Sequence, residues 1–369
     1  MNKQRICIVG DGLSGLMTAI VVSQVPGVEV NLIAKKTSKN FDKRTTAISD
    51  ANFKFIKENI THIKRNLFWP SKNIELFYET DKEKLNFLNL NEENSNLMYV
   101  FENDKIKNIL LKEISKKKIK IIRKEINNIK ELKKYDLSIL CLGGNSEIYN
   151  KIINKRSINK DYKEVAITGY IKHKFKRLNT SQFFLKEGPL AILPFSKNYF
   201  SFVWSIKKEF YKDKSKKIND LVKAKILEIF KTKKNISITN TQSYPISLDL
   251  KSQYHDKNIL ILGEGLHIIH PVAGQGFNLV LRDIKKLKEI IKYYSALGIS
   301  IKNSYALNDF YNSRKPENII MGLGVDATYN FFKRNKYLEP FKETIIKNIK
   351  NNETLKKISK IISNQGLSL

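Results

Sequence analysis

Two glycine-rich segments, far apart in a chain of 369 residues, carry the residue types best suited to chemistry. The first spans Gly10–Gly15 and follows an apolar run at residues 5–9. The second spans Gly263–Asn278 and follows an apolar run at residues 258–262. A glycine turn between a strand and a helix binds a pyrophosphate, because the helix N-terminus offers free N–H groups to an anion. The first segment therefore predicts a pyrophosphate site.

The spacing of the first segment is G-x-G-x-x-G. Gly10 permits the tight turn, Gly12 lets the backbone approach the pyrophosphate, and Gly15 lets the following helix pack on the sheet. Leu13 and Ser14 begin that helix and supply its first N–H groups. A plain glycine turn is the alternative, but the strand on either side of this unit favours a dinucleotide site.

The end of the second strand departs from the usual dinucleotide pattern. Such folds place Asp or Glu there to bind the ribose hydroxyls. This chain has Ala34 followed by Lys35 and Lys36. A lysine there can reach a phosphate instead, so we expect Lys35 or Lys36 to contact the cofactor.

The second segment suits the other half of a flavin dinucleotide. Gly263 ends a strand, and the carboxylate of Glu264 can accept hydrogen bonds from ribityl or ribose hydroxyls. The loop and helix start that follow contain Pro271, Gly274, Gln275, Gly276, Phe277 and Asn278. The backbone N–H groups beyond Pro271 are expected to face the N1–C2=O edge of the ring, where reduction places negative charge. The alternative is a simple helix-capping turn.

The two segments together predict FAD and redox chemistry. Pro271, Gly274 and Gln275 form the expected ring-side loop, and no side-chain acid or base is assigned. A metal site is not expected, because His267 and His270 have no third ligand at suitable spacing. Cys7 and Cys141 lie in apolar runs and are expected to be buried thiols, which favours a reducing, cytoplasmic compartment.

A formal net charge of +31 raises the question of an anionic partner. The lysines are spread along the chain with abundant Ile and Asn, and no nucleic-acid module accompanies them. We therefore expect no nucleic-acid partner, whereas attraction to an anionic membrane surface stays open. No apolar run is long enough to span a bilayer, and no secretory signal is seen at the N-terminus.

The hydrophobic pattern predicts an α/β protein with a Rossmann-like domain that begins as a βαβ unit. Strands are expected at 28–33, 119–126 and 136–142, a helix over 44–60, and a further helix over 103–118. The middle of the chain is strand-rich, and residues 284–369 are mostly helical. The predicted division is a discontinuous FAD-binding domain (1–73, 98–162 and 245–330), an interleaved β-sheet substrate domain (74–97 and 163–244) and C-terminal helices (331–369).

The run GEGLHIIHPVAGQGFNLVLRD at residues 263–283 resembles the UbiH-type ubiquinone-biosynthesis FAD hydroxylases, within the aromatic-hydroxylase flavoprotein superfamily. Other stretches match over nearly the whole chain: residues 41–49, which look like the family's arginine-bearing helix start, 188–194, 201–204 and 244–246, with Tyr311, Arg314 and Asp326. The resemblance implies an FAD-dependent monooxygenase that uses NAD(P)H and dioxygen, through a flavin hydroperoxide, to hydroxylate a polyprenylated phenol. It also places Arg44 beside the ribose and phosphates of FAD.

Three positions depart from the family pattern. Leu142 stands where an aspartate implicated in FAD and nicotinamide contacts is usual, Gly265-Leu266 replaces two alanines, and Ala34 was noted above. They leave an alternative function open: an FAD-binding but catalytically degenerate subunit of a ubiquinone-biosynthesis complex.

A membrane-resident substrate implies an enzyme that docks on the inner face of the cytoplasmic membrane. The tail offers a candidate surface on basic helices, formed by Phe341, Ile345, Ile349, Ile358, Ile361 and Ile362. Packing of this face on the FAD domain is the favoured alternative.

Overall fold

The computed structural model describes residues 3–35, 42–61, 63–144, 146–154, 156–333, 339–350 and 352–366. The expectations for Lys36 and Phe41, and for the side chains of Ile358 and Ile362, lie outside this description.

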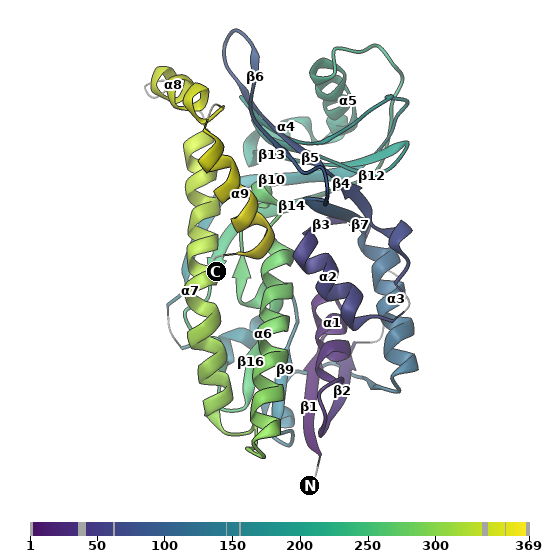
Figure 1. Ribbon diagram of the computed structural model, residues 1–369, viewed down its shortest axis with the longest axis vertical. Helices are drawn as coiled ribbons and strands as arrows, with labels where there is room; N and C mark the ends of the chain where they lie inside the picture. Colours follow the sequence, from purple (N-terminus) through teal and green to yellow (C-terminus); the bar gives the residue numbers. More distant parts are fainter. Residues whose placement is uncertain are drawn as a thin grey trace.

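A six-stranded sheet in the order β15-β16-β9-β1-β2-β8 forms the lower half of the molecule (Figure 1). Its strands are β1 (Gln4–Val9), β2 (Val28–Ala34), β8 (Lys120–Arg123), β9 (Leu137–Leu140), β16 (Ile259–Ile261) and β15 (His255–Asp256). All neighbouring strands are parallel except β15, which pairs antiparallel with β16. Helix α1 (Leu13–Val22) joins β1 to β2, so the predicted βαβ start and Rossmann-like domain are confirmed.

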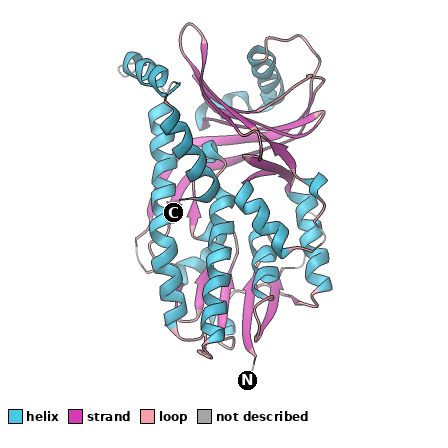
Figure 2. Ribbon diagram, in the orientation of Figure 1, coloured by secondary structure: helices cyan, strands magenta, loops and turns pink. Residues whose placement is uncertain are grey.

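Helices cover this sheet because their apolar residues fall at helical spacing. Helix α1 packs against α3 (Asn103–Lys116) and α6 (Gly276–Ala296), and α6 packs against the long helix α7 (Ser304–Phe332). Figure 2 shows these helices beside the strands of the lower half. Short 3-10 helices lie at Arg65–Leu67, Ile129–Leu132, Glu147–Lys151 and Ser215–Lys217.

An eight-stranded sheet in the order β17-β14-β10-β13-β12-β11-β5-β6 forms the second half. Its strands are β5 (Asn73–Glu79), β6 (Lys84–Asn91), β10 (Ile158–Lys172), β11 (Thr180–Leu185), β12 (Gly188–Ser196), β13 (Tyr199–Lys207), β14 (Ser237–Leu250) and β17 (His267–Ile268). Helices α4 (Lys208–Lys214) and α5 (Ile218–Ile229) adjoin it, and Val222 and Ile226 pack with Phe200, Phe202 and Trp204. The domain division remains a proposal, and strands β10 and β14 run through two of its boundaries.

One local prediction was wrong. The segment 44–60, expected to be helical, forms strand β3 (Thr45–Ser49) followed by helix α2 (Asp50–Asn59). Strand β3 pairs with β7 (Met98–Glu102), which also pairs with β4 (Trp69–Ser71). Sheet pairing therefore overrides the helical spacing up to Ser49, whose hydroxyl accepts a hydrogen bond from the Asn52 N–H and caps α2.

The chain ends in helices α8 (Glu339–Lys350) and α9 (Glu353–Gln365). Helix α8 contacts β6, and α9 contacts α2, β3 and β6. Within the part of the chain that the structure describes, no helix is long and apolar enough to cross a membrane.

Candidate functional site

A cavity of about 890 Å³ lies between the two sheets and is lined by both glycine segments. Gly12, Leu13 and Ser14 line it from the first segment. The second segment contributes Glu264, Pro271, Gly274, Gln275, Gly276, Phe277 and Asn278. Residues from distant parts of the chain therefore meet around one space, and Arg44 also lines it.

The three glycines of the first segment have separable roles. Gly10 has φ +118°, and a Cβ there or at Gly15 would overlap the carbonyl oxygen of Cys141 or of Gly10. Both therefore serve the close contact between the β1 turn, β9 and α1. Gly12 has open space around its Cα and precedes α1, so its surroundings are free to receive a ligand.

The ring-side loop forms the 3-10 turn Pro271–Ala273, followed by Gly274 in the left-handed region at φ +59°. Gln275 then precedes α6, whose N-terminal turn lines the cavity. The first N–H groups of this 21-residue helix therefore lie beside the cavity. The sequence predicts this position for N–H groups that face a negatively charged edge of a ligand.

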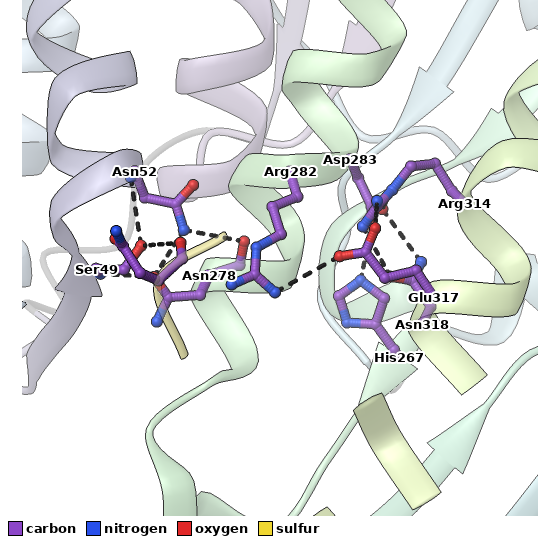
Figure 3. Close-up of polar contacts among 10 residues, drawn as sticks. Ser49, Asn52, His267, Asn278, Arg282, Asp283, Arg314, Glu317 and Asn318 are labelled. Atoms are coloured by element: carbon purple, nitrogen blue, oxygen red, sulfur yellow. Dashed lines mark hydrogen bonds and ion pairs between the residues drawn. The ribbon is translucent and has the colours of Figure 1, made fainter. Parts of the chain in front are cut away.

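Asn278 ties this loop to the neighbouring sheet. Its Oδ1 accepts hydrogen bonds from the Ser49 N–H at 2.9 Å and from Asn52 Nδ2 at 2.7 Å (Figure 3). Its Nδ2 donates to the carbonyl oxygens of Ala47 and Gly274, each at 3.2 Å. The amide of Asn278 is thus occupied by protein partners, which fix the start of α6 against β3 and α2.

Arg44 reaches the cavity from the residue before β3. Its Nε and Nη2 donate to the two carboxylate oxygens of Asp42, at 2.7 and 2.9 Å, and its guanidinium lies 4.9 Å from the ring centroid of Tyr244. The hydrogen bond that Arg44 donates to Asp42 raises the pKa of Arg44, and this effect outweighs that of burial. Burial would raise the pKa of Asp42, but Arg44 and Asn103 lower it on balance. The site therefore holds a fixed cation that Asp42 partly neutralises.

Lys35 and Glu264 are placed differently. Lys35 forms an ion pair with Glu125 and is not among the residues that line the cavity, whereas Glu264 is. Two cations lie near Asp11. Its Oδ2 is 3.7 Å from Arg123 Nη1 and 3.9 Å from Lys107 Nζ. Asp11 was not singled out from the sequence, although its place inside the glycine motif was the available signal.

Two departures from the family pattern meet at Tyr149. The Leu142 N–H donates to the Tyr149 hydroxyl at 3.0 Å. A Cβ added at Gly265 would lie 2.5 Å from that hydroxyl oxygen and 2.7 Å from Cγ2 of Ile261. The absence of a side chain at residue 265 therefore makes room for the tyrosine that fixes the turn after β9.

Replacing Gly265 by alanine should consequently destabilise the protein. We expect a loss of about 1–3 kcal/mol in the free energy of unfolding, because the new methyl group overpacks Tyr149. Urea denaturation measures it. Gly265→Ala combined with Tyr149→Phe should remain destabilised, since the ring carbon Cζ also lies within 2.6 Å of the added Cβ. Unchanged stability of the single variant would contradict this packing.

The two histidines of the second segment are engaged by separate partners. His267 Nε2 lies 2.8 Å from the carboxylate of the fully buried Asp283, which also accepts a 2.7 Å hydrogen bond from Arg314 Nε (Figure 3). His270 contacts Glu164 instead, at 3.4 Å.

The far part of the cavity carries most of its apolar lining, beside polar residues from β11 and α9. Strands β5, β6 and β11–β13 supply aliphatic and aromatic side chains, and α9 closes one side. The apolar lining residues include Ile74, Leu76, Leu88, Leu90, Leu97, Met98, Phe184, Ala191, Leu193, Val203 and Ile361. None of these was predicted to line the cavity. Ile361 was expected on the tail surface. For the strand residues, an apolar side chain carries the same signal whether it lines a cavity or fills a core.

The overall fold is similar to that of solved monooxygenase structures. The structure of p-nitrophenol 4-monooxygenase PnpA from Pseudomonas putida DLL-E4 superimposes with a TM-score of 0.76 over 100% of both chains, at 12% sequence identity. At that identity the likeness establishes the fold alone.

Sequence comparison finds relatives of this chain as well. The chain is 27% identical over 239 residues to the ubiquinone biosynthesis monooxygenase COQ6 of Dictyostelium discoideum, covering 52% of this chain and 48% of that protein. It is 28% identical over 165 residues to the 3-demethoxyubiquinol 3-hydroxylase of Escherichia coli, covering 42% and 40%. The family model described as squalene epoxidase matches residues 207–362. The matches thus span about half or less of these relatives' lengths, and the resemblance to the ubiquinone-biosynthesis FAD hydroxylases is confirmed.

Proposed function

We propose that this protein is an FAD-dependent monooxygenase that hydroxylates a polyprenylated phenol or quinone precursor in ubiquinone biosynthesis. The observation that carries the proposal is the single cavity in which both glycine segments meet an apolar wall. The relatives named for ubiquinone hydroxylation support the substrate class.

The residues present fit FAD at the polar end of the cavity. The open surroundings of Gly12 and the start of α1 would receive the pyrophosphate, with Arg44 and Glu264 beside the sugar and phosphate groups. The loop Pro271–Gly276 would hold the flavin ring. When bound, FAD would take hydride from NAD(P)H and activate dioxygen.

The apolar end would bind the substrate. Its aliphatic walls match a prenyl chain, which gains about 25 cal/mol for each Å² removed from water. The same walls exclude water from the reacting ring. The protein's part is orientation and exclusion of water, so no acid–base pair is required.

Purified protein tests this directly. We expect a yellow protein whose flavin absorbance bleaches with NADPH or NADH under anaerobic conditions and returns with air. Deletion of the gene should cause a polyprenylphenol lacking one hydroxyl group to accumulate. Unchanged quinone levels would contradict the assignment.

A degenerate, FAD-binding subunit remains the second candidate because of Leu142. Its N–H is already bonded to Tyr149, and its side chain offers no polar group to a nicotinamide. Protein that carries FAD but does not respond to either nicotinamide would favour the subunit over the enzyme.

We further propose that helix α8 docks on an anionic membrane surface, with the protein otherwise cytoplasmic. Phe341 is 70% exposed and Ile345 46% exposed, while Ile346 is fully buried against the cluster beneath the helix. Helix α8 therefore packs on the protein with one side and presents apolar side chains with the other.

The double variant Phe341→Ser and Ile345→Ser should bind vesicles containing anionic phospholipid at least about tenfold more weakly, since two apolar side chains lose their burial. Cosedimentation with vesicles measures binding. Tyr293→Ser is the matched control, because Tyr293 is 59% exposed on α6. Equal binding of the double variant and wild type would exclude α8 as the contact.

A further inference from the structure

His270, the residue before the ring-side loop, is fully buried and its ring is held from several directions. Its Nδ1 accepts a hydrogen bond from the Val272 N–H at 3.1 Å, and its Nε2 lies 3.4 Å from Oε2 of Glu164. The imidazole stacks on Tyr329 with ring centroids 4.3 Å apart and makes a T-shaped contact with Tyr162 at a centroid distance of 5.0 Å. This histidine also lines the cavity.

The bond to Val272 determines which nitrogen carries the proton. A backbone N–H can only donate, so Nδ1 must hold a lone pair and the neutral ring carries its proton on Nε2. Nε2–H then donates to Glu164. The other oxygen of Glu164 accepts from the Tyr329 hydroxyl, whose pKa is raised by burial and by this carboxylate. The Val272 N–H, both nitrogens of His270, both oxygens of Glu164 and the Tyr329 hydroxyl therefore each have a hydrogen-bond partner in this series.

A distortion of strand β10 brings Glu164 to this position. Between the pairs Asp161–Ser247 and Glu164–Ile246, β10 carries two extra residues, so its register with β14 shifts. The second of them, Lys163, has φ +55°, and its N–H donates to Oδ1 of Asp161 at 2.8 Å. A non-glycine residue in this region costs free energy, and bulges beside functional sites re-aim side chains.

The bulge places two side chains against one histidine. Tyr162 and Glu164 are both buried, whereas Lys163 between them is exposed. Glu164 is only 6% exposed, an unusual position for a carboxylate unless it is paired. The strained backbone and the buried carboxylate thus have a common consequence, the fixed orientation of His270.

We propose that Glu164 and His270 are positioning residues that set the backbone of the ring-side loop for the flavin. Val272 lies in the 3-10 turn of that loop, two residues before Gly274. The bond from Val272 to His270, and from His270 to β10, ties the loop to the substrate-side sheet. This inference rests on the proposed function, because it assumes that the loop faces FAD.

The flavin-free protein gives the first test, by hydrogen exchange of the Val272 amide. His270→Ala removes the acceptor and should lower protection of this amide by about tenfold, the value of one ordinary hydrogen bond. His270→Asn keeps an acceptor within reach of Val272 and should retain most of the protection. Equal exchange in the alanine variant and wild type would overturn the inference, whether or not the protein binds FAD.

The flavin-loaded protein gives the second test. Glu164→Gln retains one acceptor oxygen, for His270 Nε2–H or for the Tyr329 hydroxyl, whereas Glu164→Ala leaves both donors without an acceptor. We expect Glu164→Ala to raise the share of NAD(P)H consumption that ends as hydrogen peroxide by about tenfold, through misplacement of the ring, and to alter the flavin absorbance band. Glu164→Gln should lie nearer wild type.

These outcomes separate the two proposals. Failure of the unaltered protein to bind FAD would reject the proposed function, while the exchange measurement would still decide what fixes the loop. Normal FAD binding with an unchanged spectrum and peroxide share in both alanine variants would reject the positioning role alone. Restored behaviour in His270→Asn and Glu164→Gln would support it over a general loss of stability.

Discussion

Replacing Gly12 by alanine is expected to weaken FAD binding by at least about 100-fold while leaving the protein folded. Gly12 has φ −71° and ψ 174°, which alanine adopts without strain, and an added Cβ meets no protein atom within 4 Å. The methyl group would therefore cost little in the flavin-free protein. It would occupy the space through which the backbone approaches the pyrophosphate.

Gly15→Ala is the matched comparison within the same motif. There the new methyl group would overlap the Gly10 carbonyl oxygen, so the fold itself should be destabilised by about 1–3 kcal/mol or more. Titration with FAD and urea denaturation of the flavin-free proteins separate the two effects. Tight FAD binding by a folded Gly12→Ala protein would show that the pyrophosphate does not lie against this turn.

The parts of the site that local sequence could predict are those made by backbone. The strand before Gly10, the helix after it and the left-handed turn at Gly274 each follow from a few neighbouring residues. Their convergence on one cavity was inferable because each suits a different part of one ligand. The parallel sheet followed from the same alternation of strand and helix.

The remaining features depend on partners distant in the chain. Residues 45–49 form a strand because β7 pairs with them, which the helical spacing of 44–60 could not reveal. The inward turn of Glu164 depends on a bulge against β14, and the need for Gly265 depends on where Tyr149 lies. In each case the deciding contact is absent from the local pattern.

The largest expected effect on stability is at Asp283. This carboxylate is fully buried and accepts hydrogen bonds from Arg314 at 2.7 Å and Asn318 at 3.1 Å, with His267 at 2.8 Å (Figure 3). Arg314 also pairs with Glu317. Arg282 Nη1 lies 3.6 Å from the Glu317 carboxylate. The cluster joins α6, α7 and β17, so it holds the start of α6 in place beneath the cavity.

Asp283→Ala should therefore lower the free energy of unfolding by about 3–5 kcal/mol, because it leaves the Arg314 guanidinium buried without its main counter-charge. Asp309→Asn is the control, since Asp309 is exposed on the same helix as Arg314 and should change stability by less than about 1 kcal/mol. Urea denaturation at neutral pH compares the two. A loss below about 1 kcal/mol for Asp283→Ala would mean that the cluster contributes no net stability.

The contribution of Asp283 to the free energy of unfolding should decrease at low pH. Burial alone would raise the pKa of Asp283, but the charge of Arg314 and the bond to His267 bring it below its ordinary value of 3.8. A carboxylate whose pKa is lower in the folded state binds fewer protons there, so folding is favoured once the unfolded chain ionises. The stability difference between wild type and Asp283→Asn should hence be constant above that value and shrink as the pH falls below it. Denaturation curves at pH 7 and near pH 3 measure the change, and a difference that grows on acidification would show that Asp283 is protonated in the folded protein.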